Sequence, residues 1–391
     1  MAMEEKSKSE RLMSLDALRG ADMLCIMGLS GAIMAFCSWI GMKDCWLATQ
    51  MTHVDWHGFR QHDTIFPLFL FLAGVSWPFS YASQVAKGRS TGAILRKIAF
   101  RAFALFALGM VSAGLFKWDV ASFRYDSVLA HTGFCWAVAA ILYMFVRSWK
   151  IRLAIGASLL IVHWLILFSF TAPDAAALLS STDPAVAKKV AAYAAYGKDN
   201  FSFTGNIAGW IDRMFMPGKL YEGIFDPDGL LAKMTGIVTA ILGVMSGELL
   251  RSKMLSGNRK TAILLGAGAL SLALVFAWQP WCPVNKKIWT STFILAAAAY
   301  SFIALAIFYW IIDVKGFRRW TLFFRVIGMN SITIYIAMRF MGFGTMSRYF
   351  FTGIAELGNA DWSRFTFAIG QIALEWLFLW YLYRKNTFLR V

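Results

Sequence analysis

The chain has 391 residues, of which 59% are hydrophobic and only 15% are charged. Soluble globular chains carry about a quarter charged residues, so this composition excludes an ordinary soluble protein. The formal net charge of +16 would suggest nucleic-acid binding in a soluble chain. In a membrane protein the excess of Lys and Arg fits cytoplasmic loops instead, so no nucleic-acid partner is expected.

In chain order, the apolar runs are separated by charged clusters, Gly and Pro, and each approaches the roughly 20 residues that cross a bilayer core. They predict helices over 12–35, 62–86, 93–116, 126–146, 151–171, 228–250, 260–278, 287–313, 321–341 and 364–384. The fold class that follows is an all-α, polytopic integral membrane protein with about ten to eleven transmembrane helices. We expect one transmembrane domain over residues 1–391, because no linker separates a soluble domain.

The distribution of positive charge predicts the orientation of these helices. Most Lys and Arg residues fall in one set of loops, which the positive-inside rule assigns to the cytoplasm. Both termini are then cytoplasmic, which makes 1–11 a cytoplasmic tail and 172–227 a long extracytoplasmic loop. The N-terminus lacks a short apolar region with a cleavage site, so the first helix should be retained as an anchor. Short cytoplasmic loops favour a bacterial inner membrane.

The five cysteines are an odd number in no metal-ligand spacing, so they define neither a zinc site nor a disulfide framework. In the predicted topology Cys37, Cys45 and Cys282 face the outside. One pair of these three could form a disulfide, and the spacing alone does not decide whether it does.

The densest polar segment runs from His53 to Asp63, with three histidines, two aspartates and an arginine directly before a strongly apolar helix. A metal site is one interpretation, because His53 and His57 stand at i and i+4 with Asp63 as a third ligand. Gly58 discourages a continuing helix there, so no metal is expected. Acid–base or nucleophilic chemistry is the second interpretation, since an imidazole beside a carboxylate can accept a proton or an acyl group. Solvated loop residues with one structural histidine are the third.

A set of motifs extends this segment along the chain. Residues 53–76 read HVDWHGFRQHDTIFPLFLFLAGVS, in which a histidine, Trp-x-Gly, an aspartate and Phe-Pro follow one another. The other motifs are SLDALRG at 14–20, RKIAFR at 96–101, GWIDR at 209–213, FDPDGLL at 225–231, PVNKKIW at 283–289, DVKG at 313–316 and GMNSI at 328–332. In this order and over almost the whole chain, they resemble the heparan-α-glucosaminide N-acetyltransferase family of transmembrane acyltransferases.

The resemblance implies an enzyme that takes an acetyl group from cytoplasmic acetyl-CoA and delivers it to an amino sugar across the membrane, as a homodimer. The family's catalytic histidine falls on His53, and its aspartate at the start of the second helix falls on Asp63. Ser30, a candidate substrate-binding residue, stands where the lysosomal member has an asparagine implicated in catalysis. The remaining histidines and aspartate of the segment are interpreted as bystanders: Asp55, His57 and His62.

Further candidates lie at the two ends of the expected membrane domain. Arg19, Lys97 and Arg101 are at the cytoplasmic mouth within matched motifs and could bind the phosphates of acetyl-CoA. Alternatively, they only add to the positive charge that cytoplasmic loops of membrane proteins carry. Asn285 and Asn330 could bind the sugar or the thioester carbonyl through hydrogen bonds, or serve helix packing and turns.

Two rival functions stay open at this point. Ten spans with buried charges also suit a permease for a sugar or a peptidoglycan fragment, although no inverted repeat is visible in the sequence. An O-acetyltransferase acting on the hydroxyls of a surface polysaccharide is the other.

Overall fold

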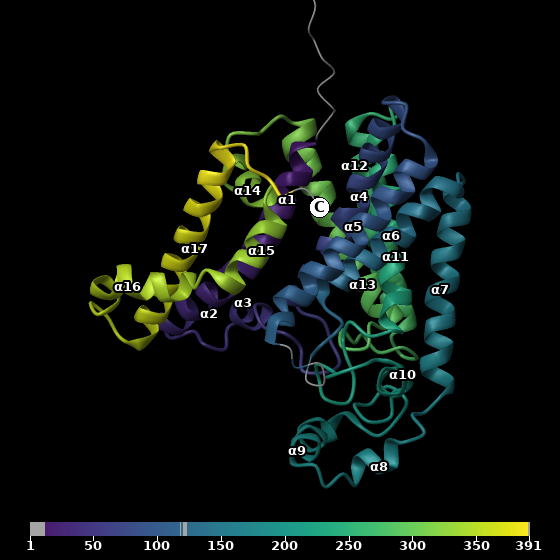
Figure 1. The fold of residues 1–391 in the computed structure, drawn as a ribbon, viewed down its shortest axis with the longest axis vertical. Helices are drawn as coiled ribbons and strands as arrows, with labels where there is room; N and C mark the ends of the chain where they lie inside the picture. Colours follow the sequence, from purple (N-terminus) through teal and green to yellow (C-terminus); the bar gives the residue numbers. More distant parts are fainter. Residues whose placement is uncertain (1–11, 118, 120–122, 390–391) are drawn as a thin grey trace, which may run out of the picture.

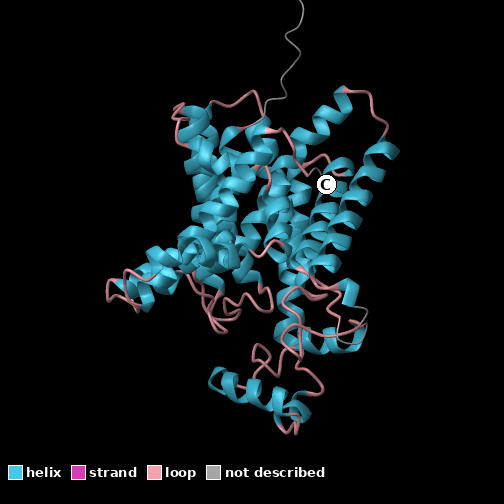
Figure 2. Cartoon of the chain, turned by 60° about the vertical axis from the view of Figure 1, so that its left-hand side comes forward, coloured by secondary structure: helices cyan, strands magenta, loops and turns pink. Residues whose placement is uncertain are grey.

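The computed structural model describes residues 12–117, 119 and 123–389, so the expected tail over 1–11 lies outside it. Across the described residues the structure is helical, apart from two isolated bridges, Arg124 to Gly218 and Thr171 to Asn206. Figures 1 and 2 show long helices side by side above a smaller region of loops and short helices. The predicted all-α membrane class is confirmed.

Every expected apolar segment forms helix. These helices are α1 (Met13–Leu24), η1 (Cys25–Leu29) and α2 (Ser30–Trp39) in the first segment, then η2 (Gln61–Thr64) with α4 (Ile65–Ala86), α5 (Thr91–Ser112), α6 (Val128–Phe145), α7 (Trp149–Ser169), α11 (Ala232–Arg251), α12 (Gly257–Trp278), α13 (Ser291–Tyr309) with η5 (Trp310–Val314), α14 (Thr321–Gly328), α15 (Ser331–Phe340) and α17 (Ala360–Arg384). The shorter elements are α3 (Trp46–Gln50), η3 (Leu115–Lys117), α8 (Ala175–Leu179), α9 (Pro184–Tyr193), η4 (Ala194–Tyr196), α10 (Ile207–Phe215) and α16 (Phe343–Ala355).

Fewer helices meet the length and hydropathy of a membrane span than the ten segments expected. Among the described residues, eight helices are long and apolar enough to cross a membrane, or nine if the bent pair α14 and α15 counts as one span. That pair replaces the single helix expected over 321–341 and bends by 68°. α5 is 22 residues long, but three basic residues in its first half shorten its apolar stretch. It therefore falls outside the count.

The helices pack in two groups. In one, α4 lies along α11, and α6, α7, α12 and α13 surround this pair. In the other, α1 lies along α14, while α17 packs against α2 and α16. Figure 1 shows α14 to α17 with α1 and α2 on one side and α4 to α7 with α11 to α13 on the other.

Small residues allow the closest helix crossings. A Cβ atom on Gly243 of α11 would lie 2.1 Å from the backbone oxygen of Phe71 in α4, and one on Gly328 of α14 would lie 1.9 Å from the backbone oxygen of Asp16 in α1. Glycine is therefore the residue that lets these backbones touch, as is common between helices in membranes.

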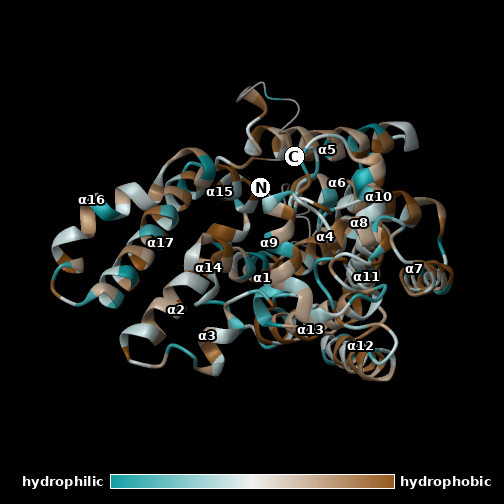
Figure 3. Ribbon diagram, turned by 90° about the horizontal axis from the view of Figure 1, so that it is seen from below, coloured by the Kyte–Doolittle hydropathy of each residue, from teal (hydrophilic) through white to brown (hydrophobic). Residues whose placement is uncertain are grey.

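The periphery of the bundle is apolar. α7 and α12 lie at the edge of the molecule in Figure 3, where much of their ribbon has the colour of hydrophobic residues. Several of these are exposed, including Ile161, Leu165, Phe168, Leu270 and Phe276. Exposed apolar side chains on spanning helices face lipid, which fits the membrane class.

The segment expected as a long extracytoplasmic loop, 172–227, is partly helical and has a core of its own. It contains α8, α9 and α10, which lie at the lower end of the molecule in Figure 1. Trp56 is 1% exposed within this core, and its indole N–H donates to the Phe201 carbonyl at 2.8 Å. The segment therefore packs directly on the polar segment between His53 and Asp63.

Candidate active site

Asp63 is held rigidly at the start of the second span. It lies in η2, where its carboxylate accepts a hydrogen bond from the backbone N–H of Arg60 at 3.1 Å. Only 1% of the residue is exposed. The position is favourable for an anion, because the N-terminal end of the helix that continues through α4 carries partial positive charge.

His53 is anchored to Asp63 at one edge of its ring and open at the rest. The His53 Nδ1 atom lies 2.8 Å from Asp63 Oδ1, and 54% of the His53 side chain is exposed. Arg60 fixes the backbone at this point, since its guanidinium donates to the His53 carbonyl at 2.9 Å and to Thr52 Oγ1 at 2.6 Å. A positive φ of 129° at Gly58 turns the chain back toward η2, and the Gly58 N–H donates to the Val284 carbonyl.

Lys286 joins this pair from the loop between α12 and α13. Its Nζ atom lies 3.0 Å from His53 Nδ1 and 3.4 Å from Asp63 Oδ1. Burial lowers the pKa of the Lys286 ammonium, and the Asp63 carboxylate opposes that shift. Lys286 stands inside the matched motif PVNKKIW, but nothing in the sequence pattern singles it out as a site residue.

Ser30 and His62 extend the site toward the first span. Ser30 is buried, and its Oγ shares a hydrogen bond of 3.0 Å with His62 Nδ1. The rings of His62 and His53 lie 4.4 Å apart between centroids. Ser30 directly follows the π-helical turn η1, where Gly28 has a φ of 122° and kinks the span. Such turns often re-aim side chains at functional sites. The structure therefore brings together His53, Asp63, Ser30 and also His62, which was interpreted as a bystander.

The two candidate asparagines take different positions. Asn285 is fully buried, and its side-chain oxygen accepts from the backbone N–H groups of Lys287 and Ile288 at 2.8 and 3.2 Å. Its amide nitrogen lies 3.4 Å from His57 Nδ1, so it holds the turn that presents Lys286. Asn330 lies at the bend between α14 and α15. Its side-chain oxygen accepts a hydrogen bond from the Thr333 hydroxyl, which is not part of the His53 segment.

The basic candidates lie on α1 and α5. Arg19 donates to Ser76 Oγ at 2.8 Å and lies 3.7 Å from Asp16. The Arg101 guanidinium stacks over the Trp136 ring at 4.2 Å, and its Nε has no hydrogen-bond partner among the described residues. Lys97 is exposed one turn before Arg101 on the same helix. Arg19 and Arg101 are close enough for their charges to repel.

A network of buried ion pairs lies beside the 172–227 segment. Arg124 contacts Asp226 at 2.6 Å and Asp228 at 2.7 Å, and Lys233 pairs with Asp126. The two aspartates bound by Arg124 belong to the motif FDPDGLL, which the structure thereby explains as an anchor of the 172–227 segment. Buried charges of this kind are paired because an isolated one is costly.

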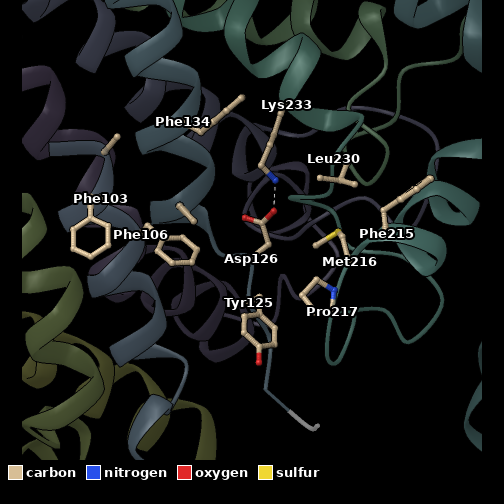
Figure 4. Close-up of a pocket in the computed structure, with 12 residues that line it drawn as sticks. Phe103, Phe106, Tyr125, Asp126, Phe134, Phe215, Met216, Pro217, Leu230 and Lys233 are labelled. Carbon is tan, nitrogen blue, oxygen red and sulfur yellow. Dashed lines mark hydrogen bonds and ion pairs between the residues drawn. The ribbon is translucent and has the colours of Figure 1, made fainter. Parts of the chain in front are cut away.

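A cavity of about 440 Å³ lies beside the second of these pairs. Figure 4 shows Asp126 and Lys233 facing each other at its wall, with aromatic and aliphatic side chains around them. Its lining includes no residue of the His53 segment. Within the described part of the chain, no three His, Cys, Asp or Glu side chains are arranged to hold a metal ion.

Comparison with known proteins gives a specific result. The chain is 27% identical over 424 residues to human heparan-alpha-glucosaminide N-acetyltransferase, a match that covers 97% of this chain and 60% of the relative. The mouse protein of the same name is 28% identical over 376 residues, covering 85% of this chain and 54% of the relative. These two matches support the predicted membership of the heparan-α-glucosaminide N-acetyltransferase family. The chain spans little more than half the length of these relatives. No protein-family model matches it.

Proposed function

We propose that this chain is a membrane acyltransferase that moves an acetyl group from acetyl-CoA to the amino group of a glucosamine-type sugar. In this proposal the donor binds on the cytoplasmic side and the acceptor on the opposite side, as the resemblance to the family implies. The observation that carries the proposal is the contact of an exposed imidazole, His53, with a buried carboxylate, Asp63, in a chain related to two proteins named as N-acetyltransferases.

In this proposal His53 acts at the reacting atoms. An amine attacks the thioester carbon, a C–N bond forms, the C–S bond breaks, and the amine proton passes through His53 to the departing CoA thiolate. Alternatively, the ring nitrogen attacks the thioester carbon, the C–S bond breaks and CoA departs as a thiolate. The amine then attacks the acetyl carbon, the bond from that carbon to the ring breaks, and the amine proton passes to the thiolate. Both routes need an imidazole nitrogen that is free to react, and the exposed edge of His53 provides it.

Asp63 and Lys286 support His53 in different ways. Asp63 accepts the hydrogen bond from Nδ1–H and leaves Nε2 with its lone pair. Lys286 places an ammonium group 3.0 to 3.5 Å from the ring nitrogens. A cation at that position can stabilise the negative oxygen that forms when the thioester carbonyl is attacked.

The donor site in this proposal is the cytoplasmic cluster of Arg19, Lys97 and Arg101. The phosphates of CoA carry several negative charges, and guanidinium groups bind phosphate through paired hydrogen bonds. The unpaired Nε of Arg101 and the mutual repulsion of Arg19 and Arg101 both favour an anion between them. The pantetheine arm would then run along the bundle toward His53.

Purified protein given acetyl-CoA labelled in the acetyl group, together with glucosamine, tests the proposal directly. The wild type should form labelled N-acetylglucosamine, and His53→Ala should form at least 100-fold less, by analogy with the loss of other general bases. His57→Ala is the matched control, because His57 lies in the same segment and should keep most activity. Sugar uptake into vesicles without any acetylated product would favour a permease, and product acetylated on oxygen would favour the O-acetyltransferase.

A further inference from the structure

Two cysteines at the outer end of the first span lie side by side and take no part in the proposed reaction. Cys37 is in the last turn of α2 and Cys45 caps the N-terminus of α3. Their Sγ atoms are 3.5 Å apart, Cys37 is 3% exposed, and both are free thiols. A disulfide needs its sulfur atoms at about 2.05 Å, so only a small movement separates this pair from a bond.

The turn between the two cysteines holds them at this distance. Gly41 has a φ of 81°, which a residue with a side chain rarely adopts, and it reverses the chain after α2. The Met42 N–H donates to the Cys37 carbonyl at 2.7 Å, and the Cys45 N–H donates to the Met42 carbonyl at 3.2 Å. The proximity of the thiols is thus built into a hydrogen-bonded turn.

We propose that Cys37 and Cys45 form a disulfide site, oxidised by exchange with a disulfide-bearing oxidant such as oxidised glutathione or a carrier protein in its disulfide form. The Cys45 thiolate attacks one sulfur of the oxidant, the S–S bond of the oxidant breaks, its other sulfur departs as a thiolate, and a mixed disulfide forms. The Cys37 thiol then loses its proton and attacks the Cys45 sulfur, the mixed disulfide breaks, and the second sulfur of the oxidant departs; both sulfurs of the oxidant end as thiols. Two electrons and two protons pass from the cysteine pair to the oxidant.

The surroundings of Cys45 suit the attacking role. The backbone N–H of Ala48 donates to Cys45 Sγ at 3.4 Å. This hydrogen bond lowers the pKa of the Cys45 thiol, which increases the fraction present as the reactive thiolate. Cys45 is also partly exposed, so an oxidant can reach it, whereas Cys37 is buried.

The bond would fix the loop that carries the proposed active site. α3 leads from Cys45 to Thr52 and His53, and its last residue, Gln50, accepts a hydrogen bond from the Gln61 N–H at 2.9 Å. A disulfide at Cys45 would tie the start of α3 to the first span, so that both ends of this short helix are held.

Mass spectrometry of the purified full chain in detergent tests this inference without reference to enzymatic activity. The protein is incubated with oxidised glutathione, denatured with an alkylating reagent and digested with trypsin without reductant. Lys43 lies between the cysteines, so cleavage there gives two peptides that stay together only through a disulfide. We expect this linked pair, its loss after dithiothreitol, and alkylated thiols at Cys25, which shares the upstream peptide with Cys37, and at the buried Cys135 and Cys282.

Alkylation of both Cys37 and Cys45 after oxidant treatment would overturn the site. Cys45→Ser is the matched variant, because its hydroxyl can still cap the Ala48 N–H. It should lose the linked peptide pair while keeping the wild-type melting temperature. Hydrogen exchange at the α3 amides should slow at least several-fold in the oxidised wild type and stay unchanged by oxidant in Cys45→Ser. Equal exchange before and after oxidation of the wild type would contradict the role of the bond in holding α3.

Discussion

The contact between His53 and Asp63 bears on which ring nitrogen carries a proton. In the proposed reaction the ionised carboxylate accepts from Nδ1–H, which leaves Nε2 with the lone pair. Asp63 is almost completely buried and also accepts from the backbone of Arg60, so its orientation is fixed before any substrate arrives. In the proposed reaction this arrangement prepares the ring for proton or acetyl transfer.

We expect Asp63→Asn to lower kcat by roughly 10²- to 10⁴-fold with little change in the KM for acetyl-CoA, because the amide can donate to Nδ1 and reverse the ring tautomer. Steady-state kinetics with glucosamine as acceptor measure both constants. Asp55→Asn, an exposed neighbour in the same segment, should behave as the wild type. A wild-type kcat in Asp63→Asn would contradict the assignment.

The lowered pKa of Lys286 predicts how kcat should depend on pH. Burial lowers the pKa of its ammonium, so the charge is lost as the pH rises through a value below the usual 10.4 or so of lysine. If the cation stabilises the transition state, kcat should fall along this alkaline limb. In Lys286→Arg the charge persists, so the limb should move to higher pH, while Lys286→Met should lose activity at every pH. A limb unchanged in Lys286→Arg would exclude this role.

The sequence was informative about residues that lie close together along the chain. His53 and Asp63 fall in one polar segment, so their pairing could be expected before the fold was known. Lys286 could not, because 233 positions separate it from His53 and only the packing of the α12–α13 loop brings them together. Ser30 and His62 illustrate the same limit, since the kink at Gly28 sets where Ser30 points.

Among the elements, the crossing of α4 and α11 depends on glycine. We expect Gly243→Ala to destabilise the protein by about 1–3 kcal/mol, because its Cβ would lie 2.1 Å from the Phe71 backbone oxygen, which cannot move away freely. The melting temperature in detergent should fall by several degrees.

Gly266→Ala in α12 is the matched control for that crossing. A Cβ there meets nothing within 4 Å, so the melting temperature should stay the same or rise slightly. Equal melting temperatures for Gly243→Ala and the wild type would mean that α4 and α11 can separate without cost.

The apolar pattern predicted where helices lie better than how many cross the membrane. All ten expected segments are helical, because apolar runs of this length must satisfy their backbone hydrogen bonds internally. Hydropathy could not foresee the 68° bend between α14 and α15, since only Met329 and Asn330 separate the two helices and the stretch as a whole stays apolar. The compact 172–227 segment was also hidden, because ion pairs and a Trp56-centred core organise it.

At the scale of the whole molecule, the proposed reaction separates donor binding from chemistry. We expect Arg101→Ala and Lys97→Ala each to raise the KM for acetyl-CoA by about 10-fold or more, since hydrogen bonds to charged groups contribute roughly 1.5–3 kcal/mol. Isothermal titration with acetyl-CoA measures the affinity directly. Lys253→Ala removes an exposed charge from a loop expected on the same side and should leave the affinity unchanged. If all three variants bind acetyl-CoA with the same affinity, Lys97 and Arg101 contribute only to the orientation of the helices in the membrane.

The contrast between a buried Asp63 and an exposed Lys97 has a consequence for ionic strength. Salt weakens attraction between exposed charges, with a screening length of about 8 Å under physiological conditions, but acts little on a buried contact. Asp63 is 1% exposed, so added salt cannot come between it and His53. Concentrated salt should therefore raise the KM for acetyl-CoA while leaving kcat almost constant, which makes the enzyme sensitive to its ionic surroundings only at the step where the donor is captured.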